Sequence, residues 1–423
     1  MKESQLLLSL REQGIYLAIA QGNLIYKALS GEPDPSTLAL LKAHKADLLR
    51  YFKQLWQRVE QTDSDFPAQG NIDIAPLSFS QERLWITEQL GAEAQIGQYN
   101  ITGACQLSGT VDTAAVEQAL EALVLRQPVL RTVIFEDAEL GVIQFVRENV
   151  QVPFQQRDLS VDPDRTAAQQ QLILQEQRRP FDLSRDVMLR AQLLKLGETE
   201  HVLVFTMHHI VSDGWSMNIL LSEFGALYNA ALHQQPHPLP PLTMHYIDYA
   251  RWQRHAADAD SVREKESWWS AQLAGAPPVH SVPLDFPRPV KQRFQGSAHH
   301  TVIEPASVSR LQTLCRRHNA TLFMGLHAIF SVLLARYSGE KDIVTGTPIA
   351  NRERAELETM IGFFVNTLAL RIDLSGTPTF EELLARSQRC VADAFAHALP
   401  FGQVVEAAQA ARSFSYSPLF QIV

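Results

Sequence analysis

Residues 201–207, HVLVFTM, form an unbroken apolar run rich in Val, Phe and Thr, and a helical pattern begins a few residues later at SMNILLSEFGALYNAAL. The run predicts a buried strand, and the apolar spacing behind it predicts a helix. Asp213-Gly214 between the two is typical of a tight turn. A strand, a turn and the start of a helix should therefore converge on His208-His209, which follow the apolar run directly.

The two histidines differ in predicted role because successive side chains on a strand face opposite sides of the sheet. One imidazole can then line a cavity while the other lies in its wall, as expected of a positioned acid or base. A zinc site that also includes Asp213 is the weaker interpretation, since neighbouring strand histidines diverge and the cysteines form no CxxC pair. We therefore predict no metal. The second pair, His299-His300, has no comparable surroundings.

The chain from about residue 75 onward predicts an α/β fold, because strand-like runs such as DIVTGTPI and TLALRIDL alternate with long helical patterns such as ATLFMGLHAIFSVLLARY. The proline-dense stretch at 236–244 separates two halves that each carry strands and helices. We expect two lobes, at 76–240 and 241–423, with a ligand cleft between them.

The first 55 residues predict a separate α+β module. Leu6, Leu7 and Leu10 share one face of a first helix, IYLAIAQGNLIYKAL predicts a hairpin turning at Gly22-Asn23, and Asp34-Pro35 is a cap and first-turn pair for a second helix. A polar, Pro/Gly-punctuated linker at 56–75 should follow. The alternative interpretation is an N-terminal extension of the next domain.

Composition narrows the class of protein. The 423 residues are enough for two or three domains, and 46% hydrophobic with 20% charged residues is typical of a globular protein. A net charge of -9 disfavours a nucleic-acid partner, and no apolar run is long enough for a membrane span. The three cysteines form no disulfide framework, so we expect a reducing, cytoplasmic location; they are Cys105, Cys315 and Cys390.

Seven segments, taken in order, resemble the signatures of the condensation domain of nonribosomal peptide synthetases. They are LSFSQERLW (77–85), RQPVLRTVIF (126–135), MHHIVSDGWS (207–216), YIDYARWQ (246–253), GTPIANR with IGFFVNTLALR (346–352 and 361–371), HALPF (397–401) and RSFSYSPLFQIV (412–423). Residues 1–55 resemble the tubulysin-type N-terminal docking domain. The resemblance implies two lobes with the chloramphenicol acetyltransferase fold, arranged as a V around a central tunnel.

The resemblance also implies a reaction. The amine of an aminoacyl thioester attacks an acyl or peptidyl thioester, and both substrates hang from 4'-phosphopantetheine arms of a donor and an acceptor carrier protein. The chain itself would bind no cofactor. His209 would hold or deprotonate the amine, and Gly214 would present its N–H to the thioester oxygen.

The other site residues implied by the resemblance are supporting ones. His208 and Asp213 would be structural, with Arg352 as the partner of Asp213 and Arg131 as the alternative partner. Trp215 and Ser216 would line the tunnel. For Arg83, Trp85, Tyr246 and Trp252, packing and buried pairing are the preferred interpretation. In the first module, the hairpin edge would add a strand from the C-terminal tail of an upstream synthetase, with four expected contacts: Tyr16, Leu17, Tyr26 and Lys27.

Some residues depart from the family pattern. Gln127-Pro128 replaces the usual His-Glu, and Gly402 replaces a usual Glu. The ending SPLFQIV predicts a second lobe that is incomplete at its C-terminus. By its resemblance to the family signatures, the sequence SDGWS favours a condensation domain that accepts an L-configured donor over an epimerization domain. Two alternatives stay open, a recruitment domain without catalysis and an acyltransferase acting on a free amine.

Overall fold

The structure is a computed structural model that describes residues 6, 10, 15–20, 23–28, 33–50, 73–90, 97–137, 141–148, 150–255, 259–292 and 296–423. It divides into two compact units, residues 1–256 with 352–364, and residues 257–351 with 365–423. The expected boundary at 240/241 therefore differs from the observed division. Helix α8 (Tyr246–His255) packs on strand β3 (Ile74–Pro76) through Ile247, which keeps it in the first unit.

The N-terminal module contains an antiparallel hairpin of β1 (Ile15–Ala20) and β2 (Asn23–Ala28). Ala20 pairs with Asn23, so Asn23 lies in the second strand and not in the turn, one residue from the expectation. Helix α2 (Pro35–Ala43) starts as predicted, since the Asp34 carboxylate accepts the N–H groups of Ser36 and Thr37. The module has its own core of Leu6, Leu10, Ile15, Leu17, Leu41 and Leu48. Leu7 and Gly22 lie outside the described residues. Of the expected linker at 56–75, residues 56–72 also lie outside them, and its last two residues, Ile74 and Ala75, belong to strand β3.

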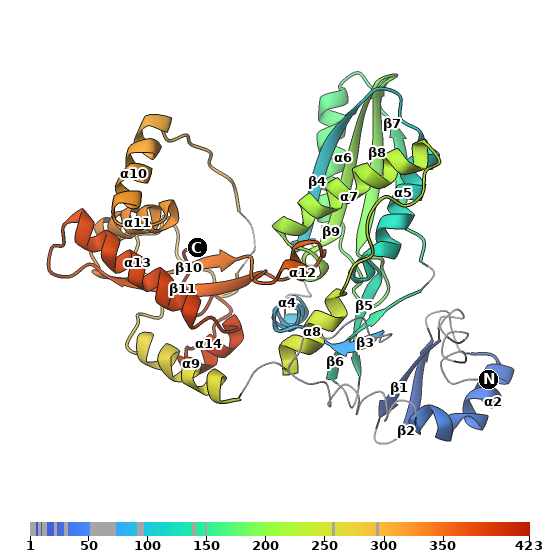
Figure 1. Ribbon diagram of the computed structural model, residues 1–423, viewed down its shortest axis with the longest axis horizontal. Coiled ribbons are helices and arrows are strands. Elements are labelled where there is room, and N and C mark those ends of the chain that lie inside the picture. The colour runs from blue at the N-terminus through green and yellow to red at the C-terminus, as the bar shows by residue number, and fades with distance from the viewer. Residues whose placement is uncertain are drawn as a thin grey trace. The chain divides into compact units, whose positions relative to one another are not determined.

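The main sheet of the first unit has the order β4-β9-β8-β7, formed by β4 (Asn100–Ser108), β7 (Phe154–Asp158), β8 (Leu189–Gly197) and β9 (Glu200–His208). Strands β7 and β8 run parallel, and the other pairs are antiparallel. Helix α6 (Arg165–Arg178) covers one face, where it packs on Val202 and Val204 (Figure 1). Helix α7 (Gly214–Leu232) covers the other, with α5 (Thr113–Arg126) beside it.

Because both faces are covered, β9 is buried from residue 201 to residue 208, as its apolar run predicts. Successive side chains of β9 face opposite sides of the sheet. Val204 packs on the α6 side, and the next residue, Phe205, packs against Phe224 of α7 with ring centroids 5.2 Å apart. A second sheet, β3-β6-β5, uses β5 (Thr132–Asp137) and β6 (Gly141–Val146). Helix α4 (Phe79–Leu90), the 3-10 helix η2 (Pro128–Arg131) and α8 also belong to this unit.

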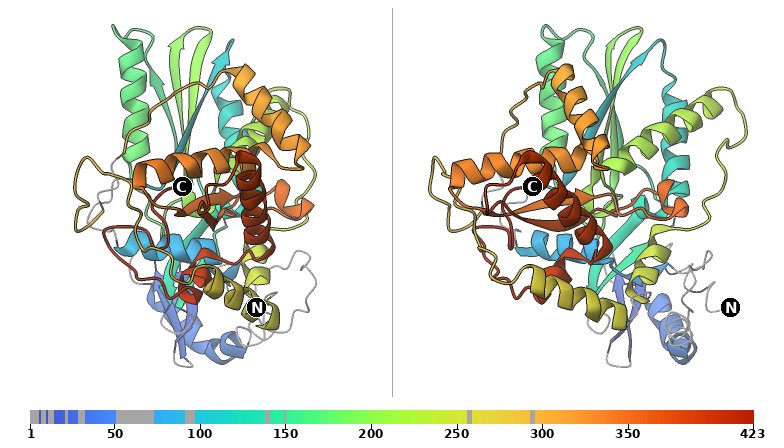
Figure 2. Two further views of the ribbon diagram at one scale, coloured as in Figure 1. Left: turned by 90° about the vertical axis from the view of Figure 1, so that its left-hand side faces the viewer. Right: turned by 60° about the vertical axis from the view of Figure 1, so that its left-hand side comes forward.

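The second unit is built on the antiparallel pair β10 (Asp342–Ile349) and β11 (Asn366–Asp373). Figure 2 shows α11 (Leu322–Ser338) and α13 (Phe380–Ala396) packed beside one another next to this pair. The remaining helices are α9 (Ala259–Gln272), α10 (Pro305–Arg317) and α14 (Phe401–Ala407). Between β10 and β11 the chain returns to the first unit as residues 352–364, which include α12 (Ala355–Glu358). The predicted strands and helices of this region are confirmed.

Within the described ranges, no single helix has the length and apolarity of a membrane span; α10 and α11 meet that test only as a pair bent by 109°.

Candidate active site

His209 lies where the buried strand β9 gives way to a short turn. Its N–H still donates to the carbonyl of Tyr99, at 2.8 Å, as a strand residue would. The strand nevertheless ends at His208, and His209 begins a 3-10 helix, η3 (His209–Val211). The expectation that both histidines belong to the strand is therefore wrong by one residue. The reason is local, because Ser212 turns the chain by donating its hydroxyl to the carbonyl of His208 at 3.0 Å.

The imidazole of His209 is held in one tautomer. Its Nδ1 lies 2.8 Å from the carbonyl oxygen of Ser212. A carbonyl oxygen can only accept, so Nδ1 carries the proton and Nε2 keeps its lone pair. Phe363 packs against the ring with centroids 4.7 Å apart and planes at 64°. The neutral ring thus presents a proton acceptor in a fixed direction.

Burial lowers the pKa of His209 below its ordinary value of 6.5, against the opposing effects of its backbone hydrogen bonds and the Asp213 carboxylate. His208, the other titratable neighbour, adds a smaller lowering. A lowered pKa keeps His209 neutral at pH 7, which is the state that can accept a proton.

His208 has a supporting position. It is 2% exposed, and its ring lies edge-on to Phe181 and Tyr99, with centroids 5.9 and 6.2 Å away. Its Nδ1 accepts the N–H of Ile210 at 3.1 Å, and its Nε2 lies 3.4 Å from a carboxylate oxygen of Glu88. Both ring nitrogens are thereby occupied, so His208 fixes the turn on which His209 stands.

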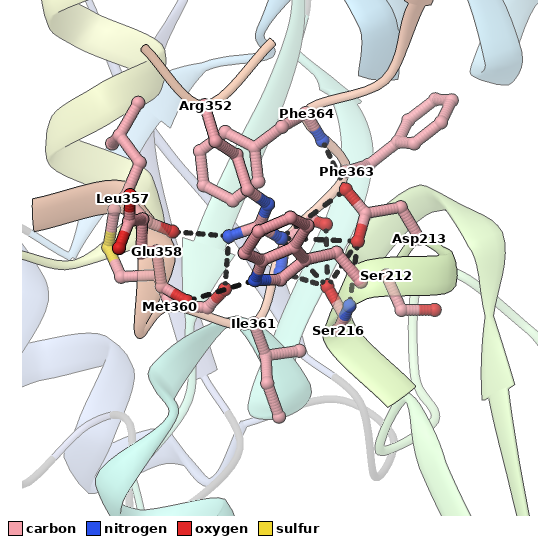
Figure 3. A network of polar contacts seen from close by, with 12 residues as sticks. Ser212, Asp213, Ser216, Arg352, Leu357, Glu358, Met360, Ile361, Phe363 and Phe364 are labelled. Atoms are coloured by element: carbon pink, nitrogen blue, oxygen red, sulfur yellow. Dashed lines mark hydrogen bonds and ion pairs between the residues drawn. The ribbon is translucent and has the colours of Figure 1, made fainter. Parts of the chain in front are cut away.

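Asp213 caps helix α7 and is the centre of the buried network in Figure 3. Its Oδ1 accepts the N–H and the hydroxyl of Ser216, at 2.9 and 2.7 Å. Its Oδ2 accepts the N–H of Phe364 at 3.3 Å. Arg352 Nη2 reaches both oxygens, at 3.1 and 3.3 Å. The expected pair of Asp213 with Arg352 is thus present, and the two side chains are 1% and 2% exposed.

Arg352 also fastens the segment that carries it. Its Nη1 donates to the carbonyl of Met360 at 2.7 Å and to that of Leu357. Its guanidinium lies 4.1 Å over the ring of Phe364. The alternative partner Arg131 is wrong for Asp213, because it ends η2 and donates to the carbonyl of Arg147 instead.

Gly214 is the first residue of α7, where backbone N–H groups have no acceptor within the helix. A Cβ built on Gly214 would meet no heavy atom within 4 Å, so the backbone can be approached closely there. Trp215 is 47% exposed and donates its ring N–H to the carbonyl of Glu358 at 3.1 Å. Ser216 is 0% exposed with its hydroxyl engaged in the Asp213 network, so its expected place on a tunnel wall is wrong.

The hairpin residues expected to dock a partner include one that cannot. Leu17 is 6% exposed and lies in the core of the module, so it is not a surface contact. The side chains of Tyr16, Tyr26 and Lys27 lie outside the described part, although their backbones pair as Tyr16 with Lys27 and Leu17 with Tyr26. Within the described ranges, no three His, Cys, Asp or Glu side chains gather as metal ligands.

The sequence did not point to several residues that contact or support His209, and Ser78, Gln81 and Phe363 are among them. Ser78 and Gln81 belong to the segment LSFSQERLW, whose S-x-x-Q spacing is that of a helix capping box and could have drawn attention to them. Phe363 had no such signal, because its contact with His209 spans more than 150 residues of chain.

Residues 71–423 match the family model of the condensation domain, and residues 4–54 match that of the TubC N-terminal docking domain. The chain therefore belongs to the condensation-domain family and carries a docking domain before it. A protein of the linear gramicidin synthase of Brevibacillus parabrevis is 41% identical over 351 residues, which are 82% of this chain and 4% of that protein. Malpibaldin synthetase of Mortierella alpina is 39% identical over 373 residues, which are 88% of this chain and 7% of that protein. The chain thus spans a small part of both relatives.

Two solved structures have the same fold. The X-domain in its complex with OxyB from teicoplanin biosynthesis is 28% identical, with a TM-score of 0.74 over 84% of this chain and 78% of that chain. A holo four-domain nonribosomal peptide synthetase bound to AMP and glycine is 26% identical, with a TM-score of 0.73 over 85% of this chain and 27% of that chain. The expected α/β condensation-domain fold is confirmed.

Proposed function

We propose that this chain catalyses amide formation between an acyl or peptidyl thioester on a donor carrier protein and the amino group of an aminoacyl thioester on an acceptor carrier protein. One observation carries the proposal. His209, in the family signature, has Nδ1–H fixed by the carbonyl of Ser212 and Nε2 left as an acceptor. The 4'-phosphopantetheine arms belong to the carrier proteins and not to this chain.

The reaction balances on these groups. The amine nitrogen attacks the thioester carbon, and the oxyanion that forms accepts a hydrogen bond from the N–H of Gly214. His209 Nε2 takes one proton from the attacking nitrogen. The C–S bond then breaks, and that proton passes to the leaving thiolate. His208, Asp213 and Arg352 would keep the turn and the helix start in place, and Trp215 would line the substrate tunnel.

The docking domain at 1–55 would bind the C-terminal tail of an upstream synthetase, and the stretch from 56 to about 70 would link it to the condensation domain, whose family match begins at residue 71. The edges of the β1-β2 hairpin support this proposal, because a two-stranded sheet offers unpaired backbone groups to an added strand.

The sequence SDGWS supports an L-configured donor. A comparison of donor carriers loaded with L- and D-aminoacyl groups would test this preference.

A recruitment domain is the second candidate, favoured by the X-domain relative whose solved structure is a complex with OxyB. The intact His209 geometry supports catalysis instead. The two are separated by intact-protein mass spectrometry of loaded donor and acceptor carriers, incubated with the wild type or with His209→Ala. Transfer of the donor mass to the acceptor by the wild type alone supports condensation. Carrier binding without transfer by either protein would support recruitment.

A further inference from the structure

The start of helix α4 is closed by a reciprocal pair of hydrogen bonds. The N–H of Gln81 donates to the hydroxyl oxygen of Ser78 at 3.2 Å, and the N–H of Ser78 donates to Gln81 Oε1 at 3.1 Å. This is a capping box, which needs only the oxygen of the glutamine side chain. The amide nitrogen is spare, and Gln81 Nε2 donates to the carbonyl of Ile210 at 3.1 Å. Ile210 is the residue directly after His209, inside η3.

The same serine also reaches Phe363, which contacts His209, through Tyr246. The Tyr246 hydroxyl lies 2.7 Å from the carbonyl of Phe363, which can only accept, so its single proton is used there. The 2.8 Å contact between Ser78 and Tyr246 must then have the serine as donor. The donor and the acceptor are therefore fixed in each hydrogen bond of the path, which runs from Gln81 through Ser78 and Tyr246 to Phe363.

One end of the path bonds the turn that contains His209, and the other end bonds the residue whose ring packs on His209. One end holds η3, and the other holds Phe363, whose ring packs on the imidazole at 4.7 Å. Ser78 and Gln81 are 0% exposed and Tyr246 is 2% exposed. If one of these hydrogen bonds is lost, its buried donor or acceptor is left without a partner, which costs free energy because water does not reach it. The Tyr246 ring is also fixed sideways, since a Cβ on Gly362 would lie 2.2 Å from it.

We infer that Ser78, Gln81 and Tyr246 are positioning residues, which act together as a clamp that holds the η3 turn carrying His209 against Phe363. The three residues come from the first and fourth signature segments. Its structural part stands on the contacts alone, and its catalytic consequence rests on the proposed function.

The test uses two neutral substitutions in the full chain, Tyr246→Phe and Gln81→Met, which change no charge near His209. Thr87→Val is the matched control, because Thr87 is also on α4 and its hydroxyl bonds the carbonyl of Arg83 at 2.8 Å, away from the clamp. Histidine-selective ¹⁵N NMR reports the tautomer and pKa of His209, with its signal assigned from its loss in His209→Ala. Single-turnover transfer rates and thermal unfolding are measured on the same proteins.

We expect the pKa of His209 to rise toward its ordinary value of 6.5 in both clamp variants and to stay unchanged in Thr87→Val, because a looser ring is better hydrated. The transfer rate should fall about ten- to a hundredfold in the clamp variants. A lower melting temperature with unaltered His209 tautomer, pKa and rate would overturn the inference. If the ring signals change while no variant and no wild type transfers, the clamp is supported and the proposed function is the part that fails.

Discussion

The chemistry proposed for His209 depends on its second nitrogen. Because Nδ1–H is committed to the carbonyl of Ser212, the acceptor is always Nε2, and no rotation of the ring is needed before reaction. His208 has the opposite pattern, with Nδ1 as acceptor of the Ile210 N–H. Two adjacent and chemically identical side chains are thus assigned different roles by their hydrogen bonds.

Asp213→Asn tests the buried ion pair at the scale of one residue. Asparagine keeps an oxygen that can cap α7, but it removes the charge opposite Arg352, which stays buried. We expect a loss of about 3–5 kcal/mol in the free energy of unfolding, measured by urea denaturation. The control is Glu406→Gln, which removes an ion pair with Arg412 in which each side chain is 71% exposed. This substitution should change the free energy of unfolding by less than about 1 kcal/mol. Equal losses in the two variants would contradict this account of Asp213.

At the scale of elements, α11 and α13 are joined by a buried histidine. Ser387 of α13 donates its hydroxyl proton to the carbonyl of Met324, so His327 Nδ1–H is the donor in the 2.8 Å contact between them. His327 Nε2 is buried and, within the described part of the chain, has no partner. Burial lowers the pKa of His327 to about 4. The joint therefore requires a neutral ring.

The buried contact between His327 and Ser387 leads us to predict that the second unit loses stability in acid. Below pH 6.5 the unfolded chain is protonated at His327, whereas the folded chain stays unprotonated there until the pH approaches about 4. The contribution of His327 to the free energy of unfolding is therefore fully present above pH 6.5 and is lost as the pH falls toward about 4. The loss should reach roughly 3 kcal/mol, measured by urea denaturation at a series of pH values. His327→Leu should flatten that part of the profile, whereas His318→Gln, a half-exposed neighbour after α10, should retain it. A wild-type slope in His327→Leu would refute the assignment.

The elements themselves were largely predictable from the sequence, because their signals are local. DIVTGTPI coincides with β10, and the Asp34 cap forms as expected. What failed was decided by contacts distant in sequence. Nothing in the segment around Arg131 shows that it meets Arg147, and Ser216 looks accessible until Gly362 packs on it. The division of the chain was missed for the same reason, since residues 352–364 belong to the first unit through contacts made by Arg352 and Phe364.

At the scale of the whole molecule, the docking domain should act by raising the local concentration of the donor. Deleting residues 1–55 should raise the KM for a donor carrier that bears the upstream C-terminal tail by at least about tenfold, with kcat unchanged. The control is the same donor carrier without its tail, for which the deletion should have no effect. An unchanged KM for the tailed carrier in a single-turnover titration would exclude docking by this module.

The central claim is that neutral His209 accepts the proton of the attacking amine, and the pH dependence of single-turnover transfer tests it most directly. The wild-type rate should fall in acid as two groups take up protons: the acceptor's amino group, whose ordinary pKa is about 7.7–8.0, and His209, whose pKa burial lowers below 6.5. His209→Ala should be slower by about 10²- to 10⁴-fold and keep only the limb of the amino group. The control is His233→Ala, which removes an exposed imidazole whose Nδ1 likewise bonds a carbonyl, that of Asn229 at 2.7 Å, and should match the wild type. A His209→Ala profile equal to that of the wild type in rate and midpoint would contradict the claim.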